Sequence, residues 1–285
     1  MSERIIKSTC CKFFNVKESE IKIIERLKLG MSNLVYLIQV NNKKYSFRIP
    51  GENSTVFVDR YAEKNGLSLI EPYNLCGKTL YFNEETGYKI SEYAEGRVLY
   101  QNIKEEDYQK VADVLHVLHD IPMGYMNSYD PFETLEYYES LNTSKFENDY
   151  YLVKNKILKY KDFLNKQKKV LCHNDSQPSN FVCGDKMYLL DYEFIGANDP
   201  LYDVACFGNN DIRDGEKLLD IYLGKKANIN EKNRYYLWRT FQNIQWYLVA
   251  LYKHELKMDE SLDLDFNSIA LMFLNQAKES IEKVK

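Results

Sequence analysis

The sequence lacks the features that would place a chain in or across a membrane. The opening residues, Met1 to Lys7, contain no apolar core of a signal peptide, and no apolar run approaches the length that spans a bilayer. The net charge is −4, so there is no general attraction to nucleic acid or to anionic lipid. These absences predict a cytoplasmic protein with no membrane insertion and no nucleic-acid partner.

The cysteines also lack the pattern of a disulfide framework or a zinc site. Six cysteines are scattered along the chain, and several lie inside apolar runs. Adjacent Cys10 and Cys11 have no second pair at zinc-ligand spacing, so we expect reduced thiols. The 285 residues, 45% apolar and 28% charged, are ordinary for a soluble globular protein and suffice for one large domain or two lobes.

The candidate catalytic and metal-binding residues are concentrated in one stretch, where two polar loops alternate with two short apolar runs. The runs Val170–Cys172 and Met187–Leu190 are typical of buried strands beside turns. Asp175, Asn180 and Asp191 follow these runs. Magnesium prefers hard oxygen ligands and takes one or two carboxylates together with phosphate oxygens. An Asp, an Asn five residues later and a second Asp after the next strand therefore indicate phosphoryl transfer.

These motifs carry a family resemblance. His173–Asn180 resembles the catalytic loop of choline kinases and aminoglycoside phosphotransferases, and Leu190–Phe194 resembles their metal-binding segment. Gly196–Ala205 is similar to bacterial choline kinases of the pathway that decorates cell-surface lipopolysaccharide with phosphorylcholine. The resemblance implies an α+β, bilobal protein-kinase-like fold. Residues 1–92 would form an N-lobe of antiparallel sheet plus one helix, and residues 93–285 a larger, mainly helical C-lobe.

The resemblance also implies a role for each residue of the catalytic stretch. Asp175 is expected to orient the substrate hydroxyl and accept its proton, with Gln177 helping to place the hydroxyl. Asn180 and Asp191 would coordinate Mg²⁺ on ATP, and Glu193 would support that metal site. Asp203, at the start of a helix, is expected to brace the catalytic loop.

The N-terminal part reads as strand, turn, strand, tight Asn-Asn turn and strand over 27–51. Gly30, Ser32 and Asn33 lie where a loop covering the nucleotide phosphates belongs in the implied fold. Arg48 alternates with Phe47 and Ile49 and so points away from their face of the sheet. By resemblance Arg48 contacts the ATP phosphates; the alternative is a solvated charge on an exposed strand face.

A carboxylate is expected to hold the Arg48 guanidinium. Glu63 is the first candidate, in a helix predicted over Phe57–Asn65 and ended by Gly66, and Glu71 is the weaker one. Lys89 to Gly96 has the character of a hinge between lobes. There the resemblance places the adenine ring against backbone groups near Glu92 and Tyr93.

Two helices carry residues that suggest ligand binding. In the helix predicted over Glu105–Asp120, His116 and His119 are interpreted as structural rather than metal-binding. In the helix of the chain's two tryptophans, Trp238, Phe241 and Gln245 share one face, and Trp246 lies at its edge. Ring faces attract a quaternary ammonium, and by resemblance Trp238 and Phe241 line a choline pocket. Gln245 and Trp246 are expected to bind the substrate with them. The alternative is that the stripe is hydrophobic core.

The function predicted from the sequence is transfer of the ATP γ-phosphoryl group to choline by a monomer or homodimer. One departure bears on the substrate: Asn209 and Asn210 fall where eukaryotic choline kinases have a pocket glutamate. Three alternatives stay open. The first is a kinase of the same fold acting on ethanolamine, thiamine or an aminoglycoside. The others are a non-catalytic nucleotide-binding module, which the intact catalytic loop disfavours, and an interaction protein, which nothing specific supports.

Overall fold

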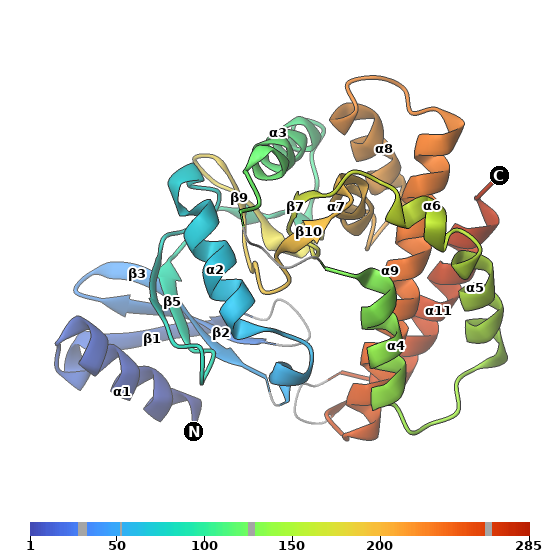
Figure 1. The fold of residues 1–285 in the computed structure, drawn as a ribbon. Coiled ribbons are helices and arrows are strands. Elements are labelled where there is room, and N and C mark those ends of the chain that lie inside the picture. The colour runs from blue at the N-terminus through green and yellow to red at the C-terminus, as the bar shows by residue number, and fades with distance from the viewer. Residues whose placement is uncertain (28–32, 52, 125–128, 260–263) are drawn as a thin grey trace. The chain divides into compact units, whose positions relative to one another are not determined.

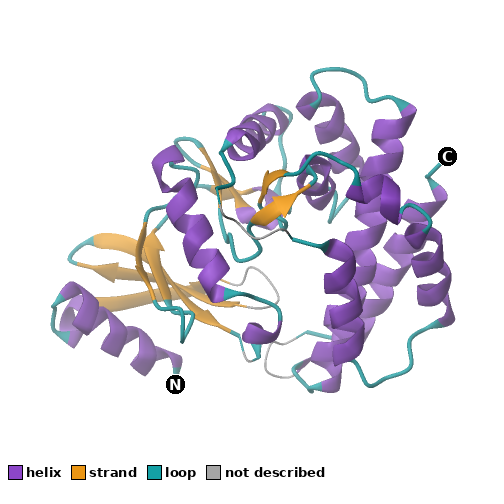
Figure 2. Cartoon of the chain, viewed as in Figure 1, coloured by secondary structure: helices purple, strands orange, loops and turns teal. Residues whose placement is uncertain are grey.

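The computed structural model describes residues 1–27, 33–51, 53–124, 129–259 and 264–285. The chain divides into two compact units (Figures 1 and 2). The first unit comprises residues 1–104 and 178–195, and the second comprises residues 105–177 and 196–285. The chain therefore passes from one unit to the other after residues 104, 177 and 195. The first unit is built on antiparallel sheets, whereas the second is mainly helical.

The main sheet of the first unit has five strands in the order β1-β2-β3-β5-β4, and all neighbours pair antiparallel. Of the succession predicted over 27–51, the two strands joined by the Asn-Asn turn are confirmed. Asn41 and Asn42 connect β2 to β3 with φ of 48° and 63°, the left-handed values that a tight hairpin turn requires. Gly30 and Ser32 lie outside the described residues. The strands are β1 (Ile21–Leu27), β2 (Asn33–Val40), β3 (Lys43–Pro50), β4 (Thr79–Phe82) and β5 (Lys89–Glu92).

Two helices cover opposite faces of this sheet. Side chains alternate along β3, so Phe47 and Ile49 pack into a core with Ile6 and Cys10 of helix α1. Arg48 points to the other face, where helix α2 lies. The helices are α1 (Ser2–Phe14) and α2 (Arg60–Ile70). Helix α1 has 13 residues and precedes the sheet in the chain.

A second, smaller sheet brings residues 178–195 into the first unit. Its order is β6-β8-β9, with both pairs antiparallel. The predicted apolar run from Met187 forms the last of these strands. The strands are β6 (Arg97–Val98), β8 (Phe181–Cys183) and β9 (Met187–Leu189), preceded by the short 3-10 helix η5 (Pro178–Asn180).

The second unit is a helical body with one two-stranded ladder, in which β7 pairs antiparallel with β10. Its longest helix, α9, has 27 residues and begins with a capping box between Asn228 and Glu231. The strands are β7 (Val170–Cys172) and β10 (Gly196–Asn198). The helices are α3 (Asp107–Asp120), α4 (Pro131–Leu141), α5 (Asn148–Leu158), α6 (Lys161–Asn165), α7 (Pro200–Phe207), α8 (Ile212–Tyr222), α9 (Ile229–Glu255) and α11 (Phe266–Glu282).

The predicted end of α2 at Gly66 is wrong. The helix begins after Asp59, whose carboxylate caps it, and continues to Ile70. Gly66 is buried within the helix, and a Cβ at this position would lie 2.2 Å from Cγ2 of Ile195. Gly66 therefore allows two chain segments to approach closely instead of ending a helix.

Among the described residues, no helix combines the length and the apolar character needed to cross a bilayer.

Candidate active site

Arg48 and Glu63 form a buried ion pair in the first unit. The two guanidinium nitrogens of Arg48 donate to the two carboxylate oxygens of Glu63 at 2.6 and 2.9 Å. Arg48 is 3% exposed and Glu63 0%, which excludes the alternative of a solvated charge on the strand face. Glu71, the weaker candidate, pairs with Lys78 in an exposed contact. The bidentate geometry fixes the plane of the guanidinium.

Glu63 also accepts hydrogen bonds from two further cations that were not predicted. Arg60 donates to Glu63 at 2.8 Å and Lys89 at 3.2 Å. Although burial alone would raise the pKa of Glu63, the charges of Lys89, Arg48 and Arg60 hold it well below the ordinary value. The i,i+3 spacing of Arg60 and Glu63 was a readable signal. The position of Lys89 depends on the pairing of β3 with β5, which no local pattern gives.

Asp191 and Glu193 extend this network. Arg48 contacts Asp191 at 3.3 Å, and Arg60 contacts Glu193 at 3.3 Å. The amide nitrogen of Asn33 donates to Glu193 at 2.9 Å and to Asp191 at 3.4 Å. Burial and the neighbouring Asp191 charge raise the pKa of Glu193, against the opposing effect of Arg48. In this structure Asn33, predicted to face phosphate, joins the two carboxylates.

Asn180 and Asp191 offer an oxygen donor set that fits Mg²⁺. The backbone N–H of Leu190 donates to the carbonyl of Asn180 at 2.8 Å, which ties the two segments together. Asp191 has φ of 64°, a left-handed conformation that is unusual for a non-glycine residue and common at functional sites. One carboxylate and one amide oxygen match the ligand types that Mg²⁺ takes from protein when phosphate supplies the rest.

Three buried polar atoms around these carboxylates have no hydrogen-bond partner in the described part of the chain. They are Oδ1 of Asn33, Nε of Arg48 and Nε of Arg60. Buried polar groups are normally satisfied by protein, water or ligand. The unsatisfied atoms therefore suit a site that takes up a polar ligand.

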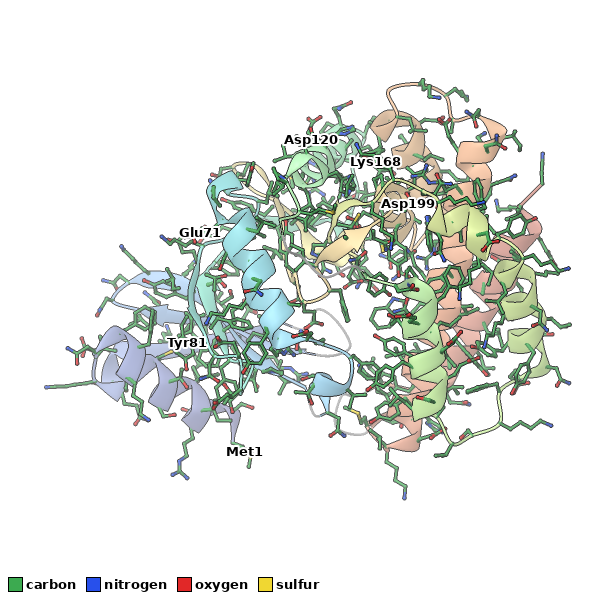
Figure 3. The ribbon with its side chains drawn as sticks, viewed as in Figure 1. Met1, Glu71, Tyr81, Asp120, Lys168 and Asp199 are labelled. Carbon is green, nitrogen blue, oxygen red and sulfur yellow. The ribbon has the colours of Figure 1, made fainter. Side chains whose placement is uncertain are left out.

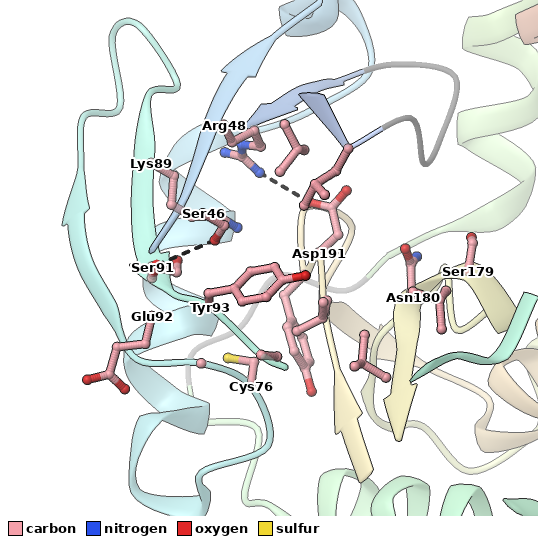
Figure 4. A pocket seen from close by; sticks show the side chains of 18 of the residues that line it. Ser46, Arg48, Cys76, Lys89, Ser91, Glu92, Tyr93, Ser179, Asn180 and Asp191 are labelled. Atoms are coloured by element: carbon pink, nitrogen blue, oxygen red, sulfur yellow. Dashed lines mark hydrogen bonds and ion pairs between the residues drawn. The ribbon is translucent and has the colours of Figure 1, made fainter. Parts of the chain in front are cut away.

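A cavity of about 530 Å³ opens in the first unit beside this network (Figure 4). This volume is in the range of small-molecule pockets. The structure brings five of the predicted residues to its lining, and Figure 4 labels each of them: Arg48, Glu92, Tyr93, Asn180 and Asp191. The lining therefore includes one cation for phosphate, Arg48, the metal-ligand types Asn180 and Asp191, and two residues of the predicted hinge.

The loop that carries Asp175 belongs to the second unit and is held through its backbone. The N–H groups of His173 and Asn174 donate to the two carboxylate oxygens of Asp203, each at 2.8 Å. Asn174 has φ of 65°, a strained conformation just before Asp175. The side-chain amide of Gln177 donates to Asp175 at 3.2 Å. Asp203 thus contacts the loop as a bracing residue would.

The histidines of α3 also act structurally. His119 contacts Asp203 at 3.1 Å and the hydroxyl of Tyr222 at 2.8 Å, and His116 stacks on the same tyrosine ring. Burial would raise the pKa of Asp203, but His119 and the loop N–H of His173 lower it. Ligand atoms of His119, Cys172 and Asp203 lie within 4.8 Å of one another. The Asp203 oxygens accept two loop N–H groups and one of them also contacts His119, so hydrogen bonds alone account for this cluster.

Trp238 and Phe241 lie in an aromatic cluster of the second unit. The indole N–H of Trp238 donates to Asp199 at 2.7 Å, and its ring meets Tyr202 edge-on at 5.2 Å. Asp199 follows β10 and is labelled in Figure 3. Both Trp238 and Phe241 are buried. The carboxylate of Asp199 is also paired with Arg234, so its charge is balanced within this cluster.

Of the other two residues of the predicted choline pocket, Gln245 adjoins the aromatic cluster and Trp246 contacts another helix. Gln245 exchanges hydrogen bonds with the hydroxyl of Tyr129 and accepts one from Tyr202. Trp246 is half-buried and stacks on Phe273 of α11 at 6.4 Å. Gln245 thus contacts the same tyrosine as Trp238, whereas the stacking contact of Trp246 is with the C-terminal helix.

The chain is similar in sequence to known proteins. The family model described as choline/ethanolamine kinase matches residues 24–214, more than half of the chain. Among curated proteins, the protein LicA of Haemophilus influenzae is 24% identical over 90% of this chain and 79% of its own length.

Solved structures show the same fold. The choline kinase LicA from Streptococcus pneumoniae superposes with a TM-score of 0.81 at 24% identity, covering 99% of both chains. An ethanolamine kinase from Plasmodium vivax gives a TM-score of 0.74 at 21% identity, covering 95% of this chain and 86% of its own. Aminoglycoside 2'-phosphotransferase-IIIa, at 14% identity, gives 0.68 over 98% and 99%. These likenesses confirm the predicted protein-kinase-like fold.

Proposed function

The chain belongs to the choline/ethanolamine kinase family of phosphotransferases, and we propose that it transfers the γ-phosphoryl group of ATP to the hydroxyl of choline. The observation that supports this proposal is that Arg48, Asn180 and Asp191 line one cavity. A cation for phosphate and two oxygen ligands for a metal are the parts that phosphoryl transfer requires, since its catalysis is mostly positioning and charge stabilisation.

ATP would bind with its phosphates against Arg48, whose guanidinium Glu63 holds in a fixed plane. The adenine ring would pair with the backbone of Glu92 and Tyr93, which line the same cavity. Phosphate contacts by the segment around Gly30 and Ser32 belong to the proposal as well. An orienting carboxylate behind the arginine lowers the entropic cost of forming the phosphate contact.

Asn180 and Asp191 would hold Mg²⁺, with Glu193 supporting Asp191 through the shared Asn33 amide. When bound, the metal neutralises the charge on the β- and γ-phosphate oxygens. Arg48, by its contact with Asp191, would orient that carboxylate toward the metal.

Asp175 would accept the proton of the substrate hydroxyl. Its carboxylate receives a hydrogen bond from Gln177, and Asp203 fixes the backbone of the loop from behind. Proton acceptance requires an ionised and oriented carboxylate. Gln177 orients the carboxylate, and Asp203 fixes the loop that carries it.

The cationic head of choline would lie against the ring faces of Trp238 and Phe241. A quaternary ammonium has no N–H to donate, so it is recognised by aromatic quadrupoles and nearby negative charge. The Asp199 carboxylate accepts from the indole N–H and is itself paired with Arg234, so the ring faces would provide most of the recognition. Gln245 and Trp246 belong to the same proposal. We further propose a cytoplasmic monomer or homodimer.

A coupled ADP-release assay over choline, ethanolamine, thiamine and kanamycin tests this function, and we expect choline to give the highest kcat/KM. Asp175→Ala should abolish turnover while the melting temperature and ATP binding stay near wild type. Wild-type turnover by the purified Asp175→Ala protein would exclude the mechanism. Preference for ethanolamine or kanamycin would replace the substrate and leave the phosphotransferase intact.

A further inference from the structure

Arg239 of α9 is a buried cation whose hydrogen-bond partners are all neutral. It is 2% exposed. In the described part of the chain, its guanidinium donates to the amide oxygens of Asn209, Gln242 and Asn243 and to the carbonyl of Ala205. Burial lowers the pKa of Arg239, because its charged form is disfavoured there. A buried charge with no counter-ion in direct contact among the described residues is costly to the fold, so packing alone does not explain it.

A line of side-chain hydrogen bonds connects this guanidinium to Asp175. Nη2 of Arg239 donates to Oδ1 of Asn209 at 2.8 Å, and Nδ2 of Asn209 donates to Oε1 of Gln177 at 2.9 Å. Nε2 of Gln177 then donates to Oδ2 of Asp175 at 3.2 Å. We call this line the amide relay. All four residues belong to the second unit.

Chemistry fixes the direction of the amide relay. A guanidinium has only donors, so Asn209 must turn its oxygen toward Arg239. Its NH₂ group then faces Gln177, whose oxygen must accept. The NH₂ group of Gln177 is left for Asp175. If residue 239 presented an acceptor instead, both amides could turn over, and Gln177 would place its carbonyl oxygen against the Asp175 carboxylate.

We propose that Arg239 is a positioning residue for phosphoryl transfer. Acting through Asn209 and Gln177, it holds the Asp175 carboxylate ready to accept the substrate proton. This inference rests on the proposed function, because it assumes that Asp175 receives the proton. It also explains why a charge is buried here. The Arg239 cation imposes one orientation on the amides of Asn209 and Gln177, which could otherwise turn either way.

Asn209→Asp tests the direction of the amide relay. An aspartate there gives Arg239 a counter-ion but cannot donate to Gln177. We expect the melting temperature to stay level or rise while kcat falls at least tenfold, with KM for ATP within twofold of wild type. A loss of stability together with wild-type kcat would overturn the proposal. Asn155→Asp is the matched control, since it adds the same charge at an exposed residue of α5 and should leave kcat within twofold.

A double-mutant cycle tests whether Arg239 acts through Gln177. We expect Arg239→Gln and Gln177→Ala each to lower kcat, and the double variant to lose little more than Gln177→Ala alone. Arg239→Lys, which keeps a donor and its charge, should retain more kcat than Arg239→Gln. Additive losses in the cycle would mean that Arg239 acts elsewhere. Should Arg239→Gln fail to fold, Arg239→Lys and Asn209→Asp still decide.

The two proposals fail differently. Full activity in Asp175→Ala would remove the proposed mechanism and this inference with it. An inactive Asp175→Ala combined with wild-type kcat in Asn209→Asp would overturn the inference alone.

Discussion

Arg48 and Glu63 meet side by side inside the first unit, joined by two hydrogen bonds of 2.6 and 2.9 Å and shielded from solvent. The strand sets the position of the arginine, and the helix sets the position of the acid. Because Arg48 also reaches Asp191 at 3.3 Å, this pair connects the sheet to the candidate metal ligands. A substitution at Glu63 should therefore change both the stability of the fold and the binding of the nucleotide.

Glu63→Gln should lower the free energy of unfolding by about 3–5 kcal/mol, as the loss of one member of a buried ion pair does. We expect KM for ATP to rise about tenfold or more, since Arg48 loses its orientation, and KM for choline to change much less. Urea unfolding and steady-state kinetics measure the two effects. Glu71→Gln, which removes the exposed pair with Lys78, should change neither; equal effects from both variants would contradict the assigned role.

The pH dependence of stability should follow Glu63. Its pKa is held below the ordinary value of 4.5 in the folded chain, by Lys89 and Arg48 against the effect of burial. The ionised carboxylate therefore stabilises the fold above about pH 4.5, and this contribution is lost as the pH falls toward the folded pKa. Glu193, with its raised pKa, acts in the opposite sense.

The measurement is urea unfolding of wild type and Glu63→Gln as the pH is lowered from neutrality through 4.5. We expect the difference in unfolding free energy between the two proteins to become smaller as the pH is lowered. A gap that stays constant down to the lowest usable pH would mean that the carboxylate charge of Glu63 contributes nothing.

Asp191→Asn should reduce kcat at least a hundredfold, the scale seen when one charge-stabilising group is removed from an active site. We also expect a higher Mg²⁺ concentration at half-maximal rate, because an amide is a weaker ligand than a carboxylate. Titrating Mg²⁺ in the kinase assay measures both. Asp185→Asn, in the exposed turn between β8 and β9 where it contacts Tyr188, is the control and should behave as wild type.

Trp238→Ala should raise KM for choline far more than KM for ATP. A ring face contributes about 0.5–2 kcal/mol to binding a cation, which corresponds to roughly 2- to 30-fold in affinity. Trp238→Phe keeps a ring face but loses the N–H that donates to Asp199, so an intermediate KM is expected. Comparable increases in both Michaelis constants would show that the residue only packs.

Local patterns in the sequence predicted much of the fold. The Asn41-Asn42 turn between alternating strands and the apolar runs flanking the catalytic stretch are short-range signals, and the structure contains the corresponding strands. Glu63 as the partner of Arg48 was also predictable, because the resemblance implied a carboxylate on the helix that follows the strand.

Contacts between distant segments were not predictable. Gly66 was interpreted as a helix end because glycine often ends helices, but its role depends on Ile195, far along the chain. Lys89 joins Glu63 only through strand pairing. Arg239 is one more polar residue in a helical pattern until the fold places Asn209 beside it. In each case the role of the residue depends on a partner from a different part of the chain.

The segment 178–195 joins the first unit although the chain has by then traversed 73 residues of the second. No truncation at a single point can therefore release a nucleotide-binding half. A fragment ending at residue 104 would lack β8, β9 and the carboxylates at 191 and 193, and would leave β6 as an unpaired edge. A separable half would need residue 104 joined to residue 178 by a designed connection, so gene fusions and split-protein reporters must respect that discontinuity.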